Sequence, residues 1–178
     1  MVKKIALAAV VVVALFLIYV ATQPSDYTVS REVTINAPAE AVFPYVNESQ
    51  KMNSWNPWTE IDPNAKITFS GPEGGVGAAT SWEGGDQLGT GTATVTESVP
   101  NQLVRTKLAY VKPFEMVQDS SVELTPAPGS TTRVKWSVNG HNTFVSRIFC
   151  VFMNMDEMVG GTFEKGLGKL KTMVEAGQ

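Results

Sequence analysis

The chain has 178 residues, 43% of them hydrophobic, and a formal net charge of −3. This length suits one domain with an appendage, and the composition excludes a disordered chain and a multispan membrane protein. The only charges before Asp26 are Lys3 and Lys4, so the rest of the chain sets 12 basic against 17 acidic residues, a net charge of −5. An acidic body without a run of Lys or Arg argues against a nucleic-acid partner, because phosphates require clustered cations.

One cysteine and one histidine limit the chemistry available to the protein. Cys150 alone excludes an intrachain disulfide and a cysteine-based metal site, and its apolar surroundings favour a small buried side chain. His141 follows Asn139-Gly140 at the end of a predicted strand, which favours an exposed turn residue. As a general base it would need an acidic partner and a place in a cavity. The sequence therefore predicts no catalytic residue, no metal site and no cofactor.

The N-terminal segment is apolar, and residues 5–21 contain no charge. That is close to the shortest helix that spans a bilayer. We predict a basic cytoplasmic tip at residues 1–4, a transmembrane anchor at 5–22 and a linker at 23–26, with the body outside the cytoplasm by the positive-inside rule. In a bacterium this means the periplasm. A cleaved signal peptide, which would release a secreted body, and a buried core helix are the alternatives; residues 19–23 offer no good small-x-small cleavage site.

The first part of the body predicts one strand and two short helical segments. Alternating apolar residues indicate a strand at residues 29–35. Pro38 suits the first position of a helix, and Pro44 argues that this helix is short or has Pro44 in its first turn. A second short helical or turn segment covers residues 52–58.

Strand signals separated by turn residues follow. Residues 103–110 and 131–138 alternate most clearly, with Arg and Lys opposite the apolar face. The Gly-rich stretches between residues 71 and 91 match no phosphate-binding loop and indicate hairpin turns. The predicted strands, which together indicate an antiparallel meander, are 67–70, 76–82, 91–99, 103–110, 115–124 and 131–138.

The end of the chain predicts one long amphipathic helix. Its apolar positions advance in steps of three and four residues, the spacing of one helical face: Met155, Val159, Phe163, Leu167, Leu170 and Val174. The preceding apolar residues 144–153 favour helix core, or alternatively an adaptable lid over a cavity mouth that could also contact lipid.

Several motifs spread over residues 27–176 resemble one known superfamily. They include Ile35-Asn36-Ala37-Pro38-Ala39-Glu40-Ala41-Val42-Phe43, Trp55-Asn56-Pro57-Trp58, Trp82-Glu83-Gly84, Val95-Thr96-Glu97 and Thr131-Thr132-Arg133-Val134-Lys135-Trp136. The body resembles the START/Bet v 1-like superfamily (SRPBCC proteins), in its polyketide cyclase/dehydrase-like branch. This resemblance implies an α+β helix-grip fold, in which a curved antiparallel sheet of six to seven strands surrounds the long C-terminal helix and encloses a cavity. The N-terminal anchor departs from the typical member and suggests a task at the membrane.

We predict that large apolar side chains line this cavity, although plain core packing is the alternative for each. The candidates are Trp55, Trp58, Trp82, Tyr110, Trp136, Phe149, Phe152 and Met155. The favoured function is binding of a hydrophobic or lipid-like small molecule, since burying an acyl chain contributes about 0.8 kcal/mol per CH₂ without special chemistry. A cyclase, dehydratase or hydrolase is less favoured because the sequence supplies few catalytic groups. A partner-binding role without a ligand remains the third alternative, because one scaffold serves many functions.

Overall fold

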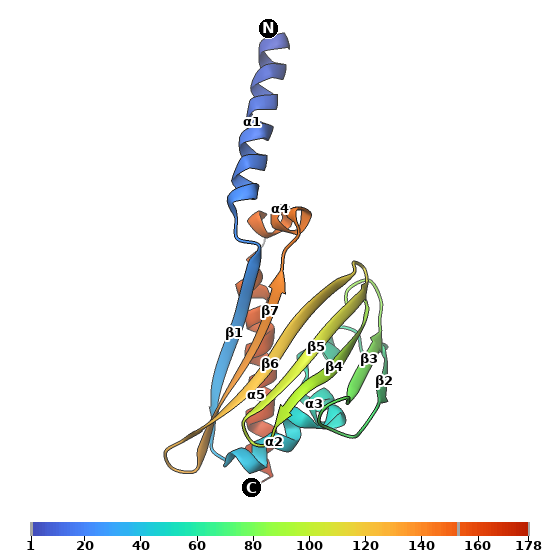
Figure 1. The fold of residues 1–178 in the computed structure, drawn as a ribbon, viewed down its shortest axis with the longest axis vertical. Helices are drawn as coiled ribbons and strands as arrows, with labels where there is room; N and C mark the ends of the chain where they lie inside the picture. The colour runs from blue at the N-terminus through green and yellow to red at the C-terminus, as the bar shows by residue number, and fades with distance from the viewer. Residues whose placement is uncertain (1, 153, 178) are drawn as a thin grey trace.

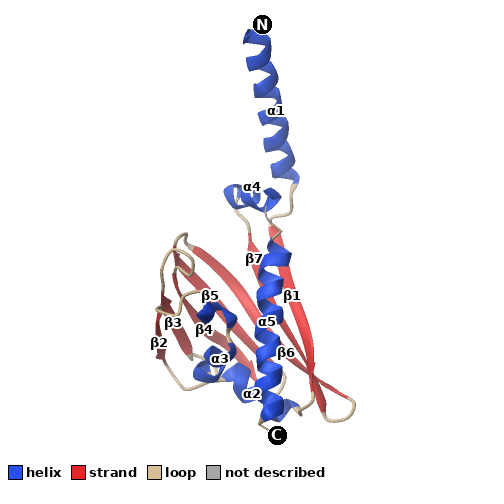
Figure 2. Ribbon diagram, turned by 180° about the vertical axis from the view of Figure 1, so that it is seen from behind, coloured by secondary structure: helices blue, strands red, loops and turns tan. Residues whose placement is uncertain are grey.

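The computed structural model describes residues 2–152 and 154–177, apart from the side chains of Phe149, Phe152 and Met155. A helix leads away from an α+β body, and the long C-terminal helix lies along one face of the sheet (Figures 1 and 2). In chain order the elements are α1 (Val2–Thr22), β1 (Asp26–Ile35), α2 (Ala39–Asn47), α3 (Ser49–Trp55), the 3₁₀ turn η1 (Pro57–Glu60), β2 (Lys66–Ser70), β3 (Ala79–Glu83), β4 (Thr90–Val99), β5 (Leu103–Lys112), β6 (Met116–Ala127), β7 (Thr131–His141), α4 (Phe144–Phe152) and α5 (Met155–Ala176).

The described strands form one antiparallel sheet in the order β1-β7-β6-β5-β4-β3-β2. Consecutive hairpins join β2 to β7, and the first strand, β1, pairs with the last strand, β7. The registers confirm both predicted alternations. Val134 and Trp136 point to the face that α5 covers, while Arg133 and Lys135 point away. The predicted helix-grip fold is confirmed.

The predicted helical face of α5 is confirmed by burial. Phe163, Leu167, Leu170 and Val174 pack against the sheet and the short helices. The sequence left two alternatives for Pro44, and the first one, a short helix, is right. The helix α2 is short, with nine residues, but Pro44 lies well inside it rather than in the first turn. The helix tolerates this position because proline removes only one backbone hydrogen bond from it.

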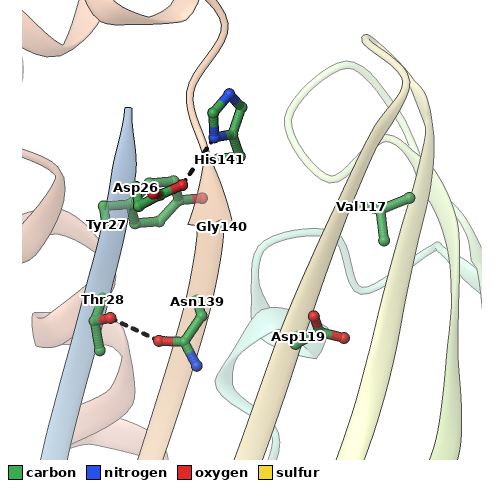
Figure 3. A pocket seen from close by; sticks show the side chains of 8 residues that line it. All are labelled: Asp26, Tyr27, Thr28, Val117, Asp119, Asn139, Gly140 and His141. Carbon is green, nitrogen blue, oxygen red and sulfur yellow. Dashed lines mark hydrogen bonds and ion pairs between the residues drawn. The ribbon is translucent and has the colours of Figure 1, made fainter. Parts of the chain in front are cut away.

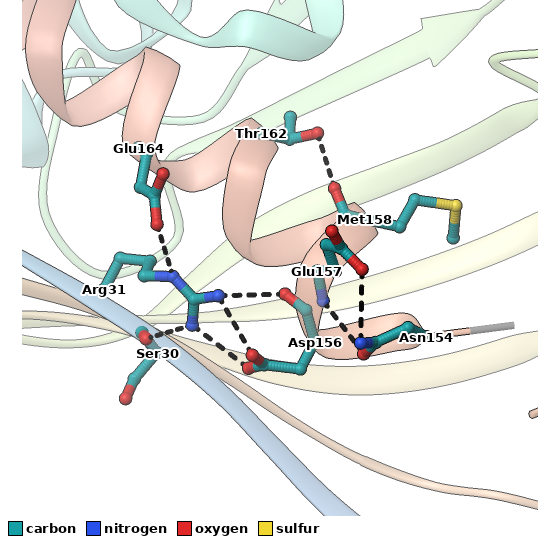
Figure 4. A network of polar contacts seen from close by, with 8 residues as sticks. All are labelled: Ser30, Arg31, Asn154, Asp156, Glu157, Met158, Thr162 and Glu164. Atoms are coloured by element: carbon teal, nitrogen blue, oxygen red, sulfur yellow. Dashed lines mark hydrogen bonds and ion pairs between the residues drawn. The ribbon is translucent and has the colours of Figure 1, made fainter.

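The beginning of α5 is held to the edge strand β1 by charge. Arg31 places Nε 2.7 Å from Glu164 Oε1 and Nη2 3.0 Å from Asp156 Oδ2, and it also donates to the Asp156 backbone carbonyl (Figure 4). The guanidinium lies against Gly160, where an added Cβ would come 2.1 Å from Nη2. Arg31 holds the pKa of the Asp156 carboxyl below its usual range. These contacts attach the first turns of α5 to β1, at one border of the sheet.

The helix α1 has 21 residues, which is long and apolar enough to cross a membrane. Only 6% of its most apolar window is buried in the body. The alternative of a buried core helix is therefore wrong, and both an anchor and a signal sequence fit this helix. At its base, Arg147 of α4 donates to the carbonyls of Ala21 and Gln23, at 3.2 and 3.1 Å. Those contacts join α4 to the point where α1 meets the body.

Candidate functional site

The face of the sheet toward α5 is closed at one end and open at the other. Residues that pair between neighbouring strands form rows across the sheet. In one such row, the side chains of Val29, Val138 and Ser120 are buried. One row nearer to α1, the side chains of Tyr27, Gln118 and Leu108 are only half-buried. The buried side of α5, from Phe163 onward, covers the end of the sheet near α2, so that end is closed. The first turns of α5 are instead attached to β1 at the border of the sheet.

The closed end is filled by aromatic rings. Trp136 stacks on Phe163 of α5 with ring centroids 4.1 Å apart, and it meets Trp55 edge to face at 5.1 Å. Both indoles are hydrogen-bonded, Trp55 Nε1 to the Tyr45 carbonyl and Trp136 Nε1 to Ser120 Oγ. The structure thus brings two of the predicted cavity residues, Trp55 and Trp136, together in the packed core.

Trp82 and Tyr110, two further predicted residues, meet at the open end. Their rings are 5.5 Å apart in an edge-to-face arrangement. Trp82 crosses the intervening strand β4 at Gly91, where an added Cβ would lie 2.4 Å from its ring, so only glycine permits this approach. The Trp82 Nε1 atom is buried and has no hydrogen-bond partner among the described residues. A buried donor of this kind calls for a partner such as a ligand or a water molecule.

A polar pair on the same face was not predicted from the sequence. Tyr27 of β1 lies across Gly140 of β7, where an added Cβ would come 2.4 Å from the hydroxyl, and it accepts a hydrogen bond from the Gln118 amide of β6. Burial raises the pKa of Tyr27, which the Gln118 hydrogen bond partly offsets. Single-strand patterns cannot show this contact because it joins residues 91 positions apart. The glycine in a strand, opposite an aromatic residue, was the one available signal.

We call the half-buried and exposed side chains at this end the open concave face. They come from β1 to β6 and combine apolar walls with two phenols, one amide and the Trp82 donor. Its members are Tyr27, Ile67, Phe69, Thr80, Trp82, Ala93, Leu108, Tyr110, Met116 and Gln118. A broad apolar wall with few convergent polar groups is the usual composition of a small-molecule site.

Burial raises the pKa of Tyr110 to about 12, and the nearby Tyr27 contributes further. Since the ordinary value is 10.0, the unfolded chain loses this proton first as the pH rises. The contribution of Tyr110 to the free energy of unfolding is fully present below pH 10. On the order of 2 kcal/mol of it is lost as the pH rises from about 10 to 12. Ultraviolet titration of tyrosinate should show a phenol that ionises late in the wild type and is missing in Tyr110→Phe. An unchanged titration curve in that variant would contradict the burial of Tyr110.

The remaining predicted residues lie elsewhere or are not described. Trp58 lies in η1 and is half-buried. The side chains of Phe149, Phe152 and Met155 lie outside the described part of the structure, so their predicted role is untested. His141 is exposed at the end of β7, with Nδ1 2.8 Å from Asp26 Oδ1. The described residues contain no cluster of three or more metal-ligating side chains.

A pocket of about 320 Å³ lies on the other face of the sheet, where β6 diverges from β7 (Figure 3). Four of its polar side chains form two pairs: Thr28 donates to Asn139 Oδ1 at 2.6 Å, and Asp26 contacts His141. We favour the open concave face as the site because its walls are apolar. The pocket is lined by Asp26, Tyr27, Thr28, Val117, Asp119, Asn139, Gly140 and His141.

Solved structures with the same fold share little sequence with this chain. Protein CV1439 from Chromobacterium violaceum aligns with a TM-score of 0.60 at 14% identity, over 83% of this chain and 96% of that one. Hypothetical protein jhp0584 from Helicobacter pylori gives 0.61 at 11% identity, over 84% and 89%. The Aha1 dimer from Colwellia psychrerythraea gives 0.57 at 21% identity, over 85% and 98%. These likenesses show the fold alone.

No curated protein sequence matches the chain. A family model does, over residues 26–175, which covers the whole sheet and nearly all of α5. The family is described as polyketide cyclase / dehydrase and lipid transport. The match excludes α1, so the apolar helix is an addition to the family's domain. The chain belongs to the polyketide cyclase/dehydrase and lipid transport family.

Proposed function

We propose that the protein is anchored in a membrane by α1, with its N-terminus in the cytoplasm, and binds a hydrophobic or lipid-like small molecule on the open concave face. The observation that carries this proposal is the half-buried apolar surface at one end of the sheet, beside a core that is closely packed at the other. A soluble domain gains by covering such a surface, and an acyl chain contributes about 0.8 kcal/mol for each CH₂ buried there.

Trp82 and Tyr110 form the aromatic wall of the proposed site. Their edge-to-face contact fixes two flat surfaces against which an acyl chain or ring can pack. The polar groups would bind the head of the same molecule. Tyr110 is protonated at neutral pH, as any tyrosine is, and so its hydroxyl can donate a hydrogen bond. This donor suits a ligand with an oxygen acceptor at one end. The Trp82 Nε1 donor is buried and would become available only if the side chain moved.

Membrane attachment is the second part of the proposal. Its support is the length and exposure of α1, together with Lys3 and Lys4 at its beginning and the absence of acidic residues before Asp26. A tethered binding domain acts within a short distance of the bilayer, where molecules of low aqueous solubility are concentrated. The family description, which includes lipid transport, agrees with this class of ligand.

Photo-crosslinking tests the site directly. The full chain in lipid nanodiscs would be irradiated with a palmitic acid analogue that carries a diazirine, and modified peptides would be mapped by mass spectrometry. We expect modification of α1, which contacts the bilayer, and separate modification of β3, β4 and β5 at residues of the open concave face. Modification confined to α1 and α4 would contradict ligand binding on the sheet, while α1 serves as the internal positive control.

A further inference from the structure

Exposed apolar side chains gather at the hairpin between β5 and β6. Phe114, at its tip, is 78% exposed, and Val111 and Val117 on the adjoining strand ends are more than half exposed. Met116 is 39% exposed and belongs to both this hairpin and the border of the open concave face. An exposed apolar patch on an otherwise polar domain marks an interaction surface.

The position of this hairpin relates it to the membrane helix. The β5–β6 turn and α4 both lie at the end of the body from which α1 leaves (Figures 1 and 2). Helix α4 lies across the base of α1 and exposes Phe144 and Val145, the latter by 61%. Arg147 fastens α4 there through the carbonyls of Ala21 and Gln23. A transverse amphipathic helix at the end of a membrane span is typical of an interfacial helix.

The opposite end of the body has a different character. The turn between β6 and β7 contains Pro128, Gly129 and Ser130, and the turn between β4 and β5 contains Asn101 and Gln102. No large exposed apolar side chain occurs in either turn, both of which lie in the described part of the chain. The β2–β3 turn at the same end exposes Val76 by 63%. The end near α1 differs because it exposes a group of apolar side chains, in the β5–β6 hairpin and in α4.

From this asymmetry we propose that the β5–β6 tip, residues 111–117, docks on the surface of the bilayer that α1 spans, together with α4. The inference rests on the anchoring role of α1 in the proposed function, but it does not require that a ligand binds. The occupant is lipid because the patch continues a surface that already begins with a membrane helix. Lys112 and Glu115 are exposed beside Phe114, so the tip enters only to the depth of the lipid headgroups.

Docking would give the open concave face a defined orientation. Met116 pairs with Tyr110 across β5 and β6, and Tyr110 contacts Trp82. The docked tip would thus bring the border of the aromatic wall to the lipid surface. A hydrophobic molecule could then pass between the bilayer and the protein along Phe114 and Met116, both of which expose apolar side chains.

Depth-dependent fluorescence quenching tests the proposal. In a Cys150→Ala background, Phe114→Cys would be labelled with the environment-sensitive NBD group in the full chain in nanodiscs. Thr125→Cys, an exposed position near the far end of β6, is the matched control. We expect a blue-shifted emission at position 114 that is quenched by phosphatidylcholine with a doxyl group near the headgroup. The label at position 125 should emit as in water and remain unquenched.

Each other outcome overturns the proposal. A water-like emission at position 114 would show that the tip stays in solvent. A blue shift without doxyl quenching would show burial against protein, such as a second copy of the chain. In a second test, Val117→Cys carries the NBD label. Adding Phe114→Asp to that variant should return the emission of the label to that in water. Since these readouts need no ligand, docking can fail while photo-crosslinking on the sheet succeeds, and the reverse also holds.

Discussion

Replacing Trp136 with alanine is expected to lower the free energy of unfolding by about 3–5 kcal/mol. The substitution removes the stacked contact with Phe163, the edge-to-face contact with Trp55 and the hydrogen bond to Ser120 Oγ. The space cannot collapse, because Trp136 lies on an interior strand and Phe163 is fixed on α5 by its buried neighbours. For a domain of this size the melting temperature should fall by on the order of 10 °C, measured by near-ultraviolet circular dichroism of the full chain in nanodiscs.

Two further variants make the comparison specific. Trp58→Ala removes an indole that is only half-buried and should destabilise the protein clearly less. Trp136→Phe keeps a ring against Phe163 and loses the hydrogen bond, and Ser120 still donates to the Ser137 carbonyl at 3.1 Å. We expect this variant to cost about 1 kcal/mol. Equal losses for Trp136→Ala and Trp58→Ala would show that the aromatic stack is not the centre of the core.

Filling the open concave face is expected to abolish the proposed ligand binding while the protein remains folded. Ala93 of β4 is half-buried and pairs with Leu108 on one side and Thr80 on the other, in the middle of this face. The large ring introduced by Ala93→Trp would cover on the order of 200 Å² of the apolar wall. Photo-crosslinks from the diazirine fatty acid to β3, β4 and β5 should therefore disappear, and those to α1 should remain.

Ala109→Trp is the matched control for this experiment. Ala109 lies on the adjacent strand β5 and is also half-buried, but it pairs with Thr92 and Val117 on the opposite face of the sheet. The same substitution there adds the same ring without touching the proposed site, and crosslinking should be unchanged. If both variants bind like the wild type, or if Ala109→Trp is the one that loses binding, the site lies elsewhere. Melting temperatures of both variants show whether either one has unfolded.

The local pattern of the sequence was sufficient for the main elements, while the helix-grip arrangement was implied by the family resemblance. Alternation in residues 103–110 and 131–138 predicted two strands and the faces they turn inward, because side chains of a strand alternate between its two faces. Steps of three and four residues predicted the buried side of α5, since 3.6 residues complete a helical turn. The uncharged stretch of residues 5–21 likewise indicated a helix that stays outside the body. Each of these signals lies within one element.

The candidate site depended on contacts between elements, and those only the tertiary structure decided. Four tryptophans looked equivalent in the sequence, yet Trp55 and Trp136 close the core while Trp82 lies on the open face. The difference comes from which part of the sheet α5 covers, and Arg31 of β1 holds α5 at the sheet border through Asp156 and Glu164. The sequence shows that a hydrophobic side chain favours burial, but it does not show what buries it. Whether protein or another molecule buries it depends on how distant segments pack, and no local pattern contains that information.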